Sequence, residues 1–274
     1  MIRINPRNSK MLTGSILLAL FLLVALLSLR WTPFKLDDMS GGRLSSPSWQ
    51  HLLGTDTLGR DQLSRVMIGA RIAIEVGFSA VLIGILIGGS VGIIAGFARG
   101  KWDDLFTSFL DTLIAFPTLL LAMLIIAARG TSLFSGILAI GLGISSVFAR
   151  VTRLLVKSVL SKDFITAARV SGTTWPRITL IHIIPNIWPT LLVTSALQVG
   201  VAGLAEASLS YLGLGAPPPN DSWGSLLQQA QNTVYSAPLS AIVPGLCLVL
   251  FVVSVNLLAD GIRFHFDQNS RVAP

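Results

Sequence analysis

Long apolar runs separated by short polar segments constrain the fold of this chain more than any other feature of its sequence. About 20 apolar residues in a helix span the hydrocarbon core of a bilayer, which is about 30 Å thick. Six runs approach or exceed that length: 11–29, 73–97, 105–128, 133–148, 187–205 and 239–258. The third contains Asp111 and Pro117, and the fourth is the shortest. The sequence therefore predicts an all-α polytopic membrane protein with about six transmembrane helices.

Composition supports the same fold class. Of 274 residues, 52% are hydrophobic and 12% are charged, and the mean hydropathy is +0.74. A soluble domain carries about 25% charged residues. We therefore expect the lipid bilayer as a partner and no nucleic acid. The single cysteine, Cys247, lies in the last apolar run and is interpreted as a small buried hydrophobe.

The basic N-terminus resembles that of a secretory signal peptide, but the details favour an uncleaved first membrane helix. Arg3, Arg7 and Lys10 precede the first apolar run. That run is longer than a typical signal-peptide core, and residues 30–32 offer no cleavage site made of small residues.

The distribution of Lys and Arg predicts the orientation in the membrane, because these residues are enriched in cytoplasmic loops. Segment 150–186 holds six of them and segment 206–238 holds none. We expect the first segment in the cytoplasm and the second outside, which puts both termini in the cytoplasm if the chain crosses six times. Segment 30–71 must then be external, although it also carries six basic residues. Four aspartates partly offset them, and we interpret this segment as a folded extracytoplasmic element.

A polar, basic insert, KDFITAARVSGTTWPRITLIHIIPN, occupies residues 162–186 between two apolar runs. Asp163 suits the start of a short helix, where the helix dipole favours an anion. Gly172 allows that helix to end, and Trp175-Pro176 is typical of the first turn of a second short helix. Pro185 precedes the fifth run. By physical chemistry alone, this loop either enters a groove of a protein partner or touches lipid headgroups.

Residues 51–65, HLLGTDTLGRDQLSR, form a second compact motif in the segment expected outside. Gly54 and Gly59 suit tight turns. Local ion pairs are expected among the charged side chains Asp56, Arg60, Asp61 and Arg65. A structural cap over the outer mouth is one interpretation, and a surface that receives substrate is the other.

Both motifs resemble those of permease subunits of binding-protein-dependent ABC importers. The A-A-x-x-x-G spacing that ends in I-x-P resembles the cytoplasmic EAA loop of that family, and the family's Glu is Thr166 here. Residues 51–65 resemble the H-x-L-G-T-D-x-x-G-R-D-x-x-S-R signature of the second permease of dipeptide, oligopeptide and nickel importers. The residues that carry the signature are His51, Gly54, Thr55, Asp56, Gly59, Arg60, Asp61, Ser64 and Arg65. The resemblance covers nearly the whole chain.

This resemblance implies a permease of the type I ABC importer fold in a bacterial inner membrane. It implies a membrane helix and external segment over 1–71, a core over 72–264 with a coupling loop at 151–186, and a cytoplasmic tail over 265–274. The implied partners are a homologous second permease, two ATPase subunits and an external substrate-binding protein. ATP and Mg would bind the ATPases, and this chain would need no cofactor. The residues implied in coupling are Asp163, Thr166, Ala167, Ala168, Arg169, Gly172 and Pro185.

A glycine repeat in the second apolar run predicts a close helix–helix contact. Its members recur every four residues: Gly84, Gly88, Gly92, Gly96 and Gly100. At 3.6 residues per turn, neighbours in this series share one helix face. Small residues let helices approach closely in a membrane. The contact lies either within the chain or against the partner permease.

Charge inside a membrane is costly and is therefore often functional. Asp111 and Glu206 are the candidates for the transport pathway, with hydrogen bonding at a helix end as the alternative.

Catalytic motifs are not convincing. Residues 96–102 lack the spacing and the Ser or Thr of a phosphate-binding loop, and the G-x-S-x-G match at 88–92 lies inside an apolar run. The three histidines lie on different segments, so we expect no metal site and no enzyme activity.

The function expected is therefore the uptake of dipeptides or oligopeptides, with nickel or a metal chelate as the alternative. Two rival classes remain. An ion-coupled secondary carrier would usually show paired intramembrane charges and inverted repeats. A membrane-embedded enzyme would need a catalytic cluster.

Overall fold

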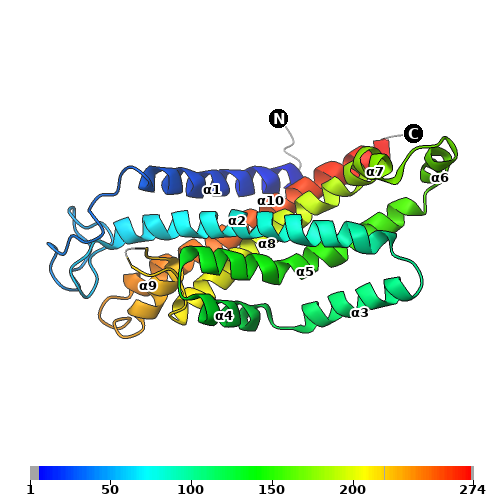
Figure 1. Ribbon diagram of the computed structural model, residues 1–274. Coiled ribbons are helices and arrows are strands. Elements are labelled where there is room, and N and C mark those ends of the chain that lie inside the picture. Colours follow the sequence, from blue (N-terminus) through cyan, green and yellow to red (C-terminus); the bar gives the residue numbers. More distant parts are fainter. Residues whose placement is uncertain (1–5, 219, 273–274) are drawn as a thin grey trace, which may run out of the picture.

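The computed structural model describes residues 6–218 and 220–272 and is built almost entirely from helices (Figure 1). A single isolated β-bridge pairs Thr55 with Asp61 in the described part of the chain. The helices are α1 (Pro6–Ser28), α2 (Gln62–Phe97), α3 (Lys101–Ala115), α4 (Thr118–Arg129), α5 (Leu133–Leu160), α6 (Asp163–Val170), α7 (Trp175–Ile178), the π-helical turn η1 (Thr179–Ile183), α8 (Ile184–Tyr211), α9 (Trp223–Ala230) and α10 (Leu239–Val272). The predicted all-α class is confirmed.

Five helical segments are long and apolar enough to cross a membrane, and a bent pair makes a sixth if it counts as one span. The five are α1, α2, α5, the continuous segment from α7 to α8, and α10. The pair is α3 and α4, whose axes differ by 81°. The bend follows from Pro117, since a proline disfavours helical geometry at the residue before it, and Phe116 is extended with ψ 124°.

Several helices extend beyond the apolar runs that predicted them. α2 begins at Gln62 rather than at residue 73, and its 36 residues make a rod about 54 Å long, well beyond the hydrocarbon core. α10 continues to Val272 through the predicted boundary at residue 265, while residues 273–274 lie outside the described part. Apolar runs mark the part of a helix that lies in lipid and not the helix itself.

The second short helix predicted after Gly172 begins at Trp175 with Pro176 in its first turn, as expected. It is not a separate element, because helical geometry continues through η1 into α8, and Pro185 lies in the first turn of α8. The π turn directly before Pro185 widens the helix where the missing N–H and the proline ring would disturb an α-helix. Asn186 donates a side-chain hydrogen bond to the carbonyl of His182 at 2.8 Å, which stabilises this irregular turn.

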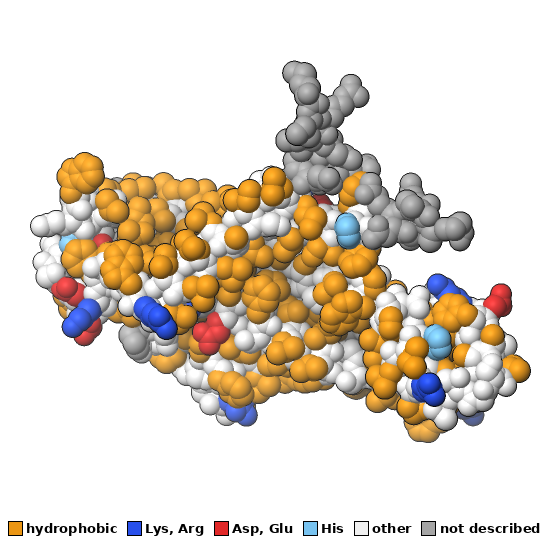
Figure 2. Space-filling view, turned by 90° about the horizontal axis from the view of Figure 1, so that it is seen from above, with side chains coloured by type: hydrophobic (Ala, Val, Ile, Leu, Met, Phe, Trp, Pro, Cys, Tyr) orange, Lys and Arg blue, Asp and Glu red, His pale blue; other side chains and the backbone are white. Residues whose placement is uncertain are grey.

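The helices lie roughly along one axis, so the molecule has two distinct ends (Figure 1). The C-terminal part of α10 and the helix α6 lie toward one end, called here the α6 end. The segment between α1 and α2, together with α9, forms the other, called the α9 end. Hydrophobic side chains cover most of the face seen in Figure 2. Exposed ones on the long helices include Leu82, Leu86 and Ile94 of α2, as a lipid-facing surface requires.

The glycine repeat faces α5. A Cβ at Gly84 or Gly96 would meet side chains of α5, and one at Gly88 or Gly92 would also meet its backbone carbonyls. The close contact is therefore within the chain. Gly100 is the exception, because α2 ends at Phe97 and Gly100 lies in the turn before α3 with φ +56°. In the described part of the chain, a Cβ at Gly100 would meet no neighbouring atom within 4 Å. Its place in the repeat was a coincidence of spacing.

We expect Gly88→Ala to destabilise the protein and Gly89→Ala to be tolerated. The new methyl at residue 88 would overlap the carbonyl oxygen of Ser145, whereas at residue 89 the nearest atom is a side-chain carbon 3.9 Å away. Overpacking of this kind typically costs about 1–3 kcal/mol. Thermal unfolding of the two purified variants in one detergent measures the difference. Equal midpoints for both would show that α2 and α5 are not tightly apposed at Gly88.

Candidate functional site

The helix α6 lies at the tip of the α6 end and divides into an inner and an outer face. Ile165 is buried, 2% exposed, and Ala168 packs beside the core. On the opposite face, the exposed side chains follow helical spacing: Asp163, Thr166, Ala167 and Val170. Val170 is 85% exposed although it is apolar. The side chains of this outer face are short and mostly uncharged. They are also exposed, so the face could enter a groove of another protein.

The end of α6 follows from Gly172. Its φ is +80°, a conformation that glycine adopts at little cost. The N–H of Thr173 donates to the carbonyl of Ala168 and the N–H of Gly172 to that of Arg169, both at 3.0 Å. This is a Schellman motif, which satisfies the last carbonyls of the helix. The helix break expected at Gly172 is present.

Aromatic contacts join the loop to the end of α2. The guanidinium carbon of Arg169 lies 4.3 Å from the ring centroid of Trp175. That ring also meets Phe97, the last residue of α2, edge to face at 5.3 Å. These three side chains line an open groove together with Arg99, Pro176 and Thr179. Because Trp175 also begins the long helix that becomes α8, displacement of α6 would act on both α2 and α8.

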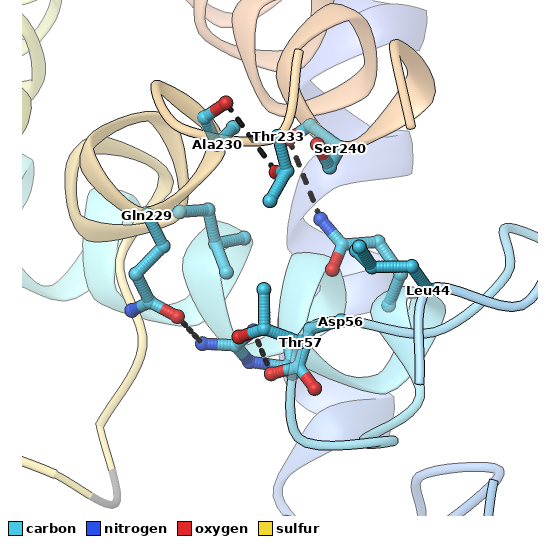
Figure 3. A pocket seen from close by; sticks show the side chains of 10 residues that line it. Leu44, Asp56, Thr57, Gln229, Ala230, Thr233 and Ser240 are labelled. Atoms are coloured by element: carbon cyan, nitrogen blue, oxygen red, sulfur yellow. Dashed lines mark hydrogen bonds and ion pairs between the residues drawn. The ribbon is translucent and has the colours of Figure 1, made fainter. Parts of the chain in front are cut away.

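A second concentration of polar groups lies at the α9 end, around Arg65 at the end of the first turn of α2. Arg65 is 1% exposed. Its Nε and Nη2 donate to the two carboxylate oxygens of Asp221 at 2.8 and 3.0 Å, and its Nη1 donates to Asp56 at 2.7 Å. Nη2 also donates to Gln229 of α9 at 2.6 Å. Figure 3 shows Gln229 and Asp56 approaching this guanidinium from different elements. We call Asp56, Arg60, Arg65, Asp221 and Gln229 the Arg65 cluster.

Asp56 is held ionised by its own turn. Burial alone would raise the pKa of its carboxyl group, but hydrogen bonds from Arg60 and Leu58 and the charge of Arg65 outweigh burial and lower the pKa. The N–H groups of Leu58 and Arg60 both donate to Oδ1 at 2.8 Å, and Nε of Arg60 donates to Oδ2 at 2.8 Å. Gly59 closes this turn with φ +80°, and a Cβ there would overlap the carbonyl of Gly41.

The remaining signature residues stabilise the same element. Asp61 caps α2 by accepting from the N–H and hydroxyl of Ser64, both at 2.8 Å, and its other oxygen lies 3.0 Å from Nδ1 of His51. Thr55 donates to the carbonyl of Gly42, and Gly54 has φ +77°. The signature therefore folds as one unit. The expected ion pairs of Asp56 with Arg60 and Arg65 are present, whereas Asp61 pairs with His51 instead.

Sequence reasoning missed Asp221 and Gln229, which lie 156 and 164 residues from Arg65. The available signal was weak: Asp221 is an acid in a segment that carries no Lys or Arg. Next to it, the indole N–H of Trp223 donates to the carbonyl of Val66 at 3.1 Å, and the ring packs on Gly69. α9 is thus fixed to the beginning of α2.

The cavity beside Arg65 is too small for a substrate. It has about 20 Å³ and is lined by residues that include Thr57, Gln62, Thr233 and Ser240 (Figure 3). That volume holds about one water molecule. The cluster is therefore a joint between segments that are distant in sequence, and not a binding pocket.

The two pathway candidates have different surroundings. Asp111 on α3 is exposed and lies 3.5 Å from Nη1 of Arg150. Glu206 on α8 is 6% exposed and accepts a hydrogen bond from the hydroxyl of Ser210 at 2.6 Å. Over residues 6–218 and 220–272, no three His, Cys, Asp or Glu side chains are grouped so that they could hold a metal ion.

The long apolar helices, with the exposed short helix α6 at one end and the Arg65 cluster at the other, define a polytopic membrane protein. Residues 80–272 match the family described as "Binding-protein-dependent transport system inner membrane component". The chain belongs to this family and is a permease subunit of an ABC importer.

Curated relatives cover almost the full length. The chain is 36% identical to the dipeptide transport system permease protein DppC of Alkalihalophilus pseudofirmus, over 97% of this chain and 88% of that one. It is 36% identical to the glutathione transport system permease protein GsiD of Escherichia coli, over 95% of this chain and 87% of the other.

A solved structure supports the fold. An inward-facing MetNI methionine ABC transporter matches with a TM-score of 0.60 at 18% identity, over 77% of this chain and 96% of that one. The type I importer fold implied by the resemblance is confirmed.

Proposed function

We propose that this permease imports short peptides. The observation that carries the proposal is the 36% identity, over nearly the full length, to permeases named for dipeptide and glutathione transport. Both substrates are small molecules built around amide bonds. Nickel or a metal chelate is the alternative, since the signature at residues 51–65 resembles permeases of both substrate groups.

The partners proposed are a homologous second permease, two ATPase subunits and an external substrate-binding protein. The outer face of α6 contacts an ATPase, and ATP and Mg bind there and not on this chain. When the ATPase pair closes on ATP, α6 moves with it. Trp175 and the continuous helix to Tyr211 carry that movement to α2 and α8, and the cavity between the two permeases opens outward.

Uptake by the reconstituted complex tests the substrate. We expect vesicles with the four membrane-associated subunits and the binding protein to accumulate a labelled dipeptide when ATP is supplied. A dipeptide should compete with its uptake and nickel should not. Accumulation of nickel or a chelate without peptide competition would replace the peptide assignment by the alternative.

The topology proposed puts the α6 end and both termini in the cytoplasm and the α9 end outside. In a Cys247→Ser background, an impermeant thiol reagent added outside should label Ser236→Cys and spare Ser171→Cys. Both residues are exposed, whereas Ser225 is occupied in the capping box of α9 and is a poor reporter. The reverse labelling pattern would invert the topology.

A further inference from the structure

The helix α3 has little apolar packing to hold it in place. Of its 15 residues only Leu110 is buried. Its large apolar side chains Trp102, Leu105 and Phe109 are 55–67% exposed. Helical geometry is interrupted at both of its ends: Gly100 adopts φ +56° at one end, and the break at Pro117 lies at the other. α3 is therefore a short rod that no continuous helix ties to its neighbours in sequence.

Ion pairs fasten this rod to α5. The two carboxylate oxygens of Asp103, in the first turn of α3, contact Nη2 of Arg153 and Nζ of Lys157. Nη2 of Arg153 also donates to the hydroxyl of Thr107 at 2.6 Å. The side chain of Arg153 is only 10% exposed, and among the described residues its Nε has no hydrogen-bond partner. Asp103 therefore balances a mostly buried cation, so removing its carboxylate would leave that cation without its counter-charge, which costs more than losing a surface ion pair.

These partners lie on the stem of the docking helix. Lys157 is in the last turn of α5, which ends at Leu160, and α6 begins at Asp163. A displacement of α6 must act on this turn first. Apolar contacts along α3 are few, and the other ion pair between α3 and α5, Asp111 with Arg150, is half-exposed on both sides. Asp103 is therefore the more buried of the two charged links that make α3 follow α5.

We propose that Asp103 is a positioning residue for energy coupling, which makes α3, and with it the broken span α3–α4, move together with the stem of α6. The proposal rests on the proposed docking of an ATPase on α6. It predicts that the contact between Asp103 and α5 stays closed throughout the transport cycle.

The test is the amount of peptide transported per ATP hydrolysed by the reconstituted complex. Asp103→Asn should lower this ratio at least about fivefold, the lower end of a typical coupling energy, while the ATPase subunits stay bound. Asp103→Glu should restore most of it. Lys101→Gln, an exposed change in the same turn, should leave the ratio unchanged. An unchanged ratio in Asp103→Asn would overturn the proposal.

A covalent replacement separates this role from one in folding. Asp103→Cys with Lys157→Cys, in a Cys247→Ser background, should transport poorly per ATP until a short bifunctional thiol reagent joins the two residues. The comparison uses one protein before and after cross-linking, so a folding defect does not change it. Transport that stops on cross-linking would mean that the contact must open. ATPase retention distinguishes this proposal from the docking proposal. The ATPase subunits should be lost from the complex with Val170→Asp and should stay bound to the complex with Asp103→Asn.

Discussion

Val170→Asp should strip the ATPase subunits from the complex while leaving the permease folded. Val170 is 85% exposed on the outer face of α6, so the free chain tolerates a carboxylate there. In the docked state proposed above, the same carboxylate would enter a groove of the ATPase with no partner for its charge. An unpaired buried charge costs about 3–5 kcal/mol, which corresponds to at least about a hundredfold loss of affinity. ATPase retention on the affinity-purified complex and uptake in vesicles measure the effect.

Two further variants on α6 sharpen this result. Thr166→Glu restores the family's residue on the same outer face and should be tolerated. Ala168→Asp should damage the permease itself, because the half-buried Ala168 packs against the hydrophobic core of its own chain. Normal retention together with normal uptake in Val170→Asp would remove α6 as the ATPase contact.

Much of the docking segment was predictable because it depends on local chemistry. The helix and its end at Gly172 follow from residue types and spacing. Which side of α6 is buried does not follow from them, because it depends on how the helix lies on the rest of the chain, where Ile165 is part of the hydrophobic core. The continuous helix through Pro185 was missed for a related reason: a proline marks a local conflict, but only the whole structure shows that a π turn resolves it.

Hydropathy located the membrane segments but not the ends of their helices. The beginning of α2 carries the polar residues Gln62, Ser64 and Arg65, so an apolar run does not include this part of the helix. The period of the glycine repeat predicted a shared face correctly up to Gly96. Periodicity cannot detect that α2 ends at Phe97, which is why Gly100 was assigned to the wrong element.

Ion pairs within the signature were predictable because their partners are close in sequence. The salt bridge between Arg65 and Asp221 was not, since nothing local specifies a partner 156 residues away. This long-range contact joins the N-terminal segment to the core of the permease. It also carries the second large effect expected from the structure.

Arg65→Met should weaken the attachment of α9 to the start of α2 and abolish uptake, although Trp223 still contacts Val66 and Gly69. Asp221, whose side chain is 8% exposed, would lose the cation that holds it. Breaking a buried pair by removing one partner costs about 3–5 kcal/mol. Arg60→Met is the matched control, because it removes an arginine from the same cluster while Asp56 keeps Arg65. That pair is local and less buried, so we expect a loss of about 1 kcal/mol or less. Thermal unfolding of the purified complexes compares the stabilities of the Arg65→Met and Arg60→Met variants. An equal loss of stability in both would mean that Arg65 is not the centre of the cluster.

The double variant Arg65→Met with Asp221→Leu separates charge from shape. Replacing a buried ion pair by apolar side chains of similar volume is often neutral or stabilising. If the pair serves only to attach α9, the double variant should regain stability and uptake together, since Asp56 retains Arg60 and Trp223 still packs on Gly69. Recovered stability without uptake would show that transport needs the charges themselves at the α9 end. The signature would then act in receiving substrate and not only as a structural cap.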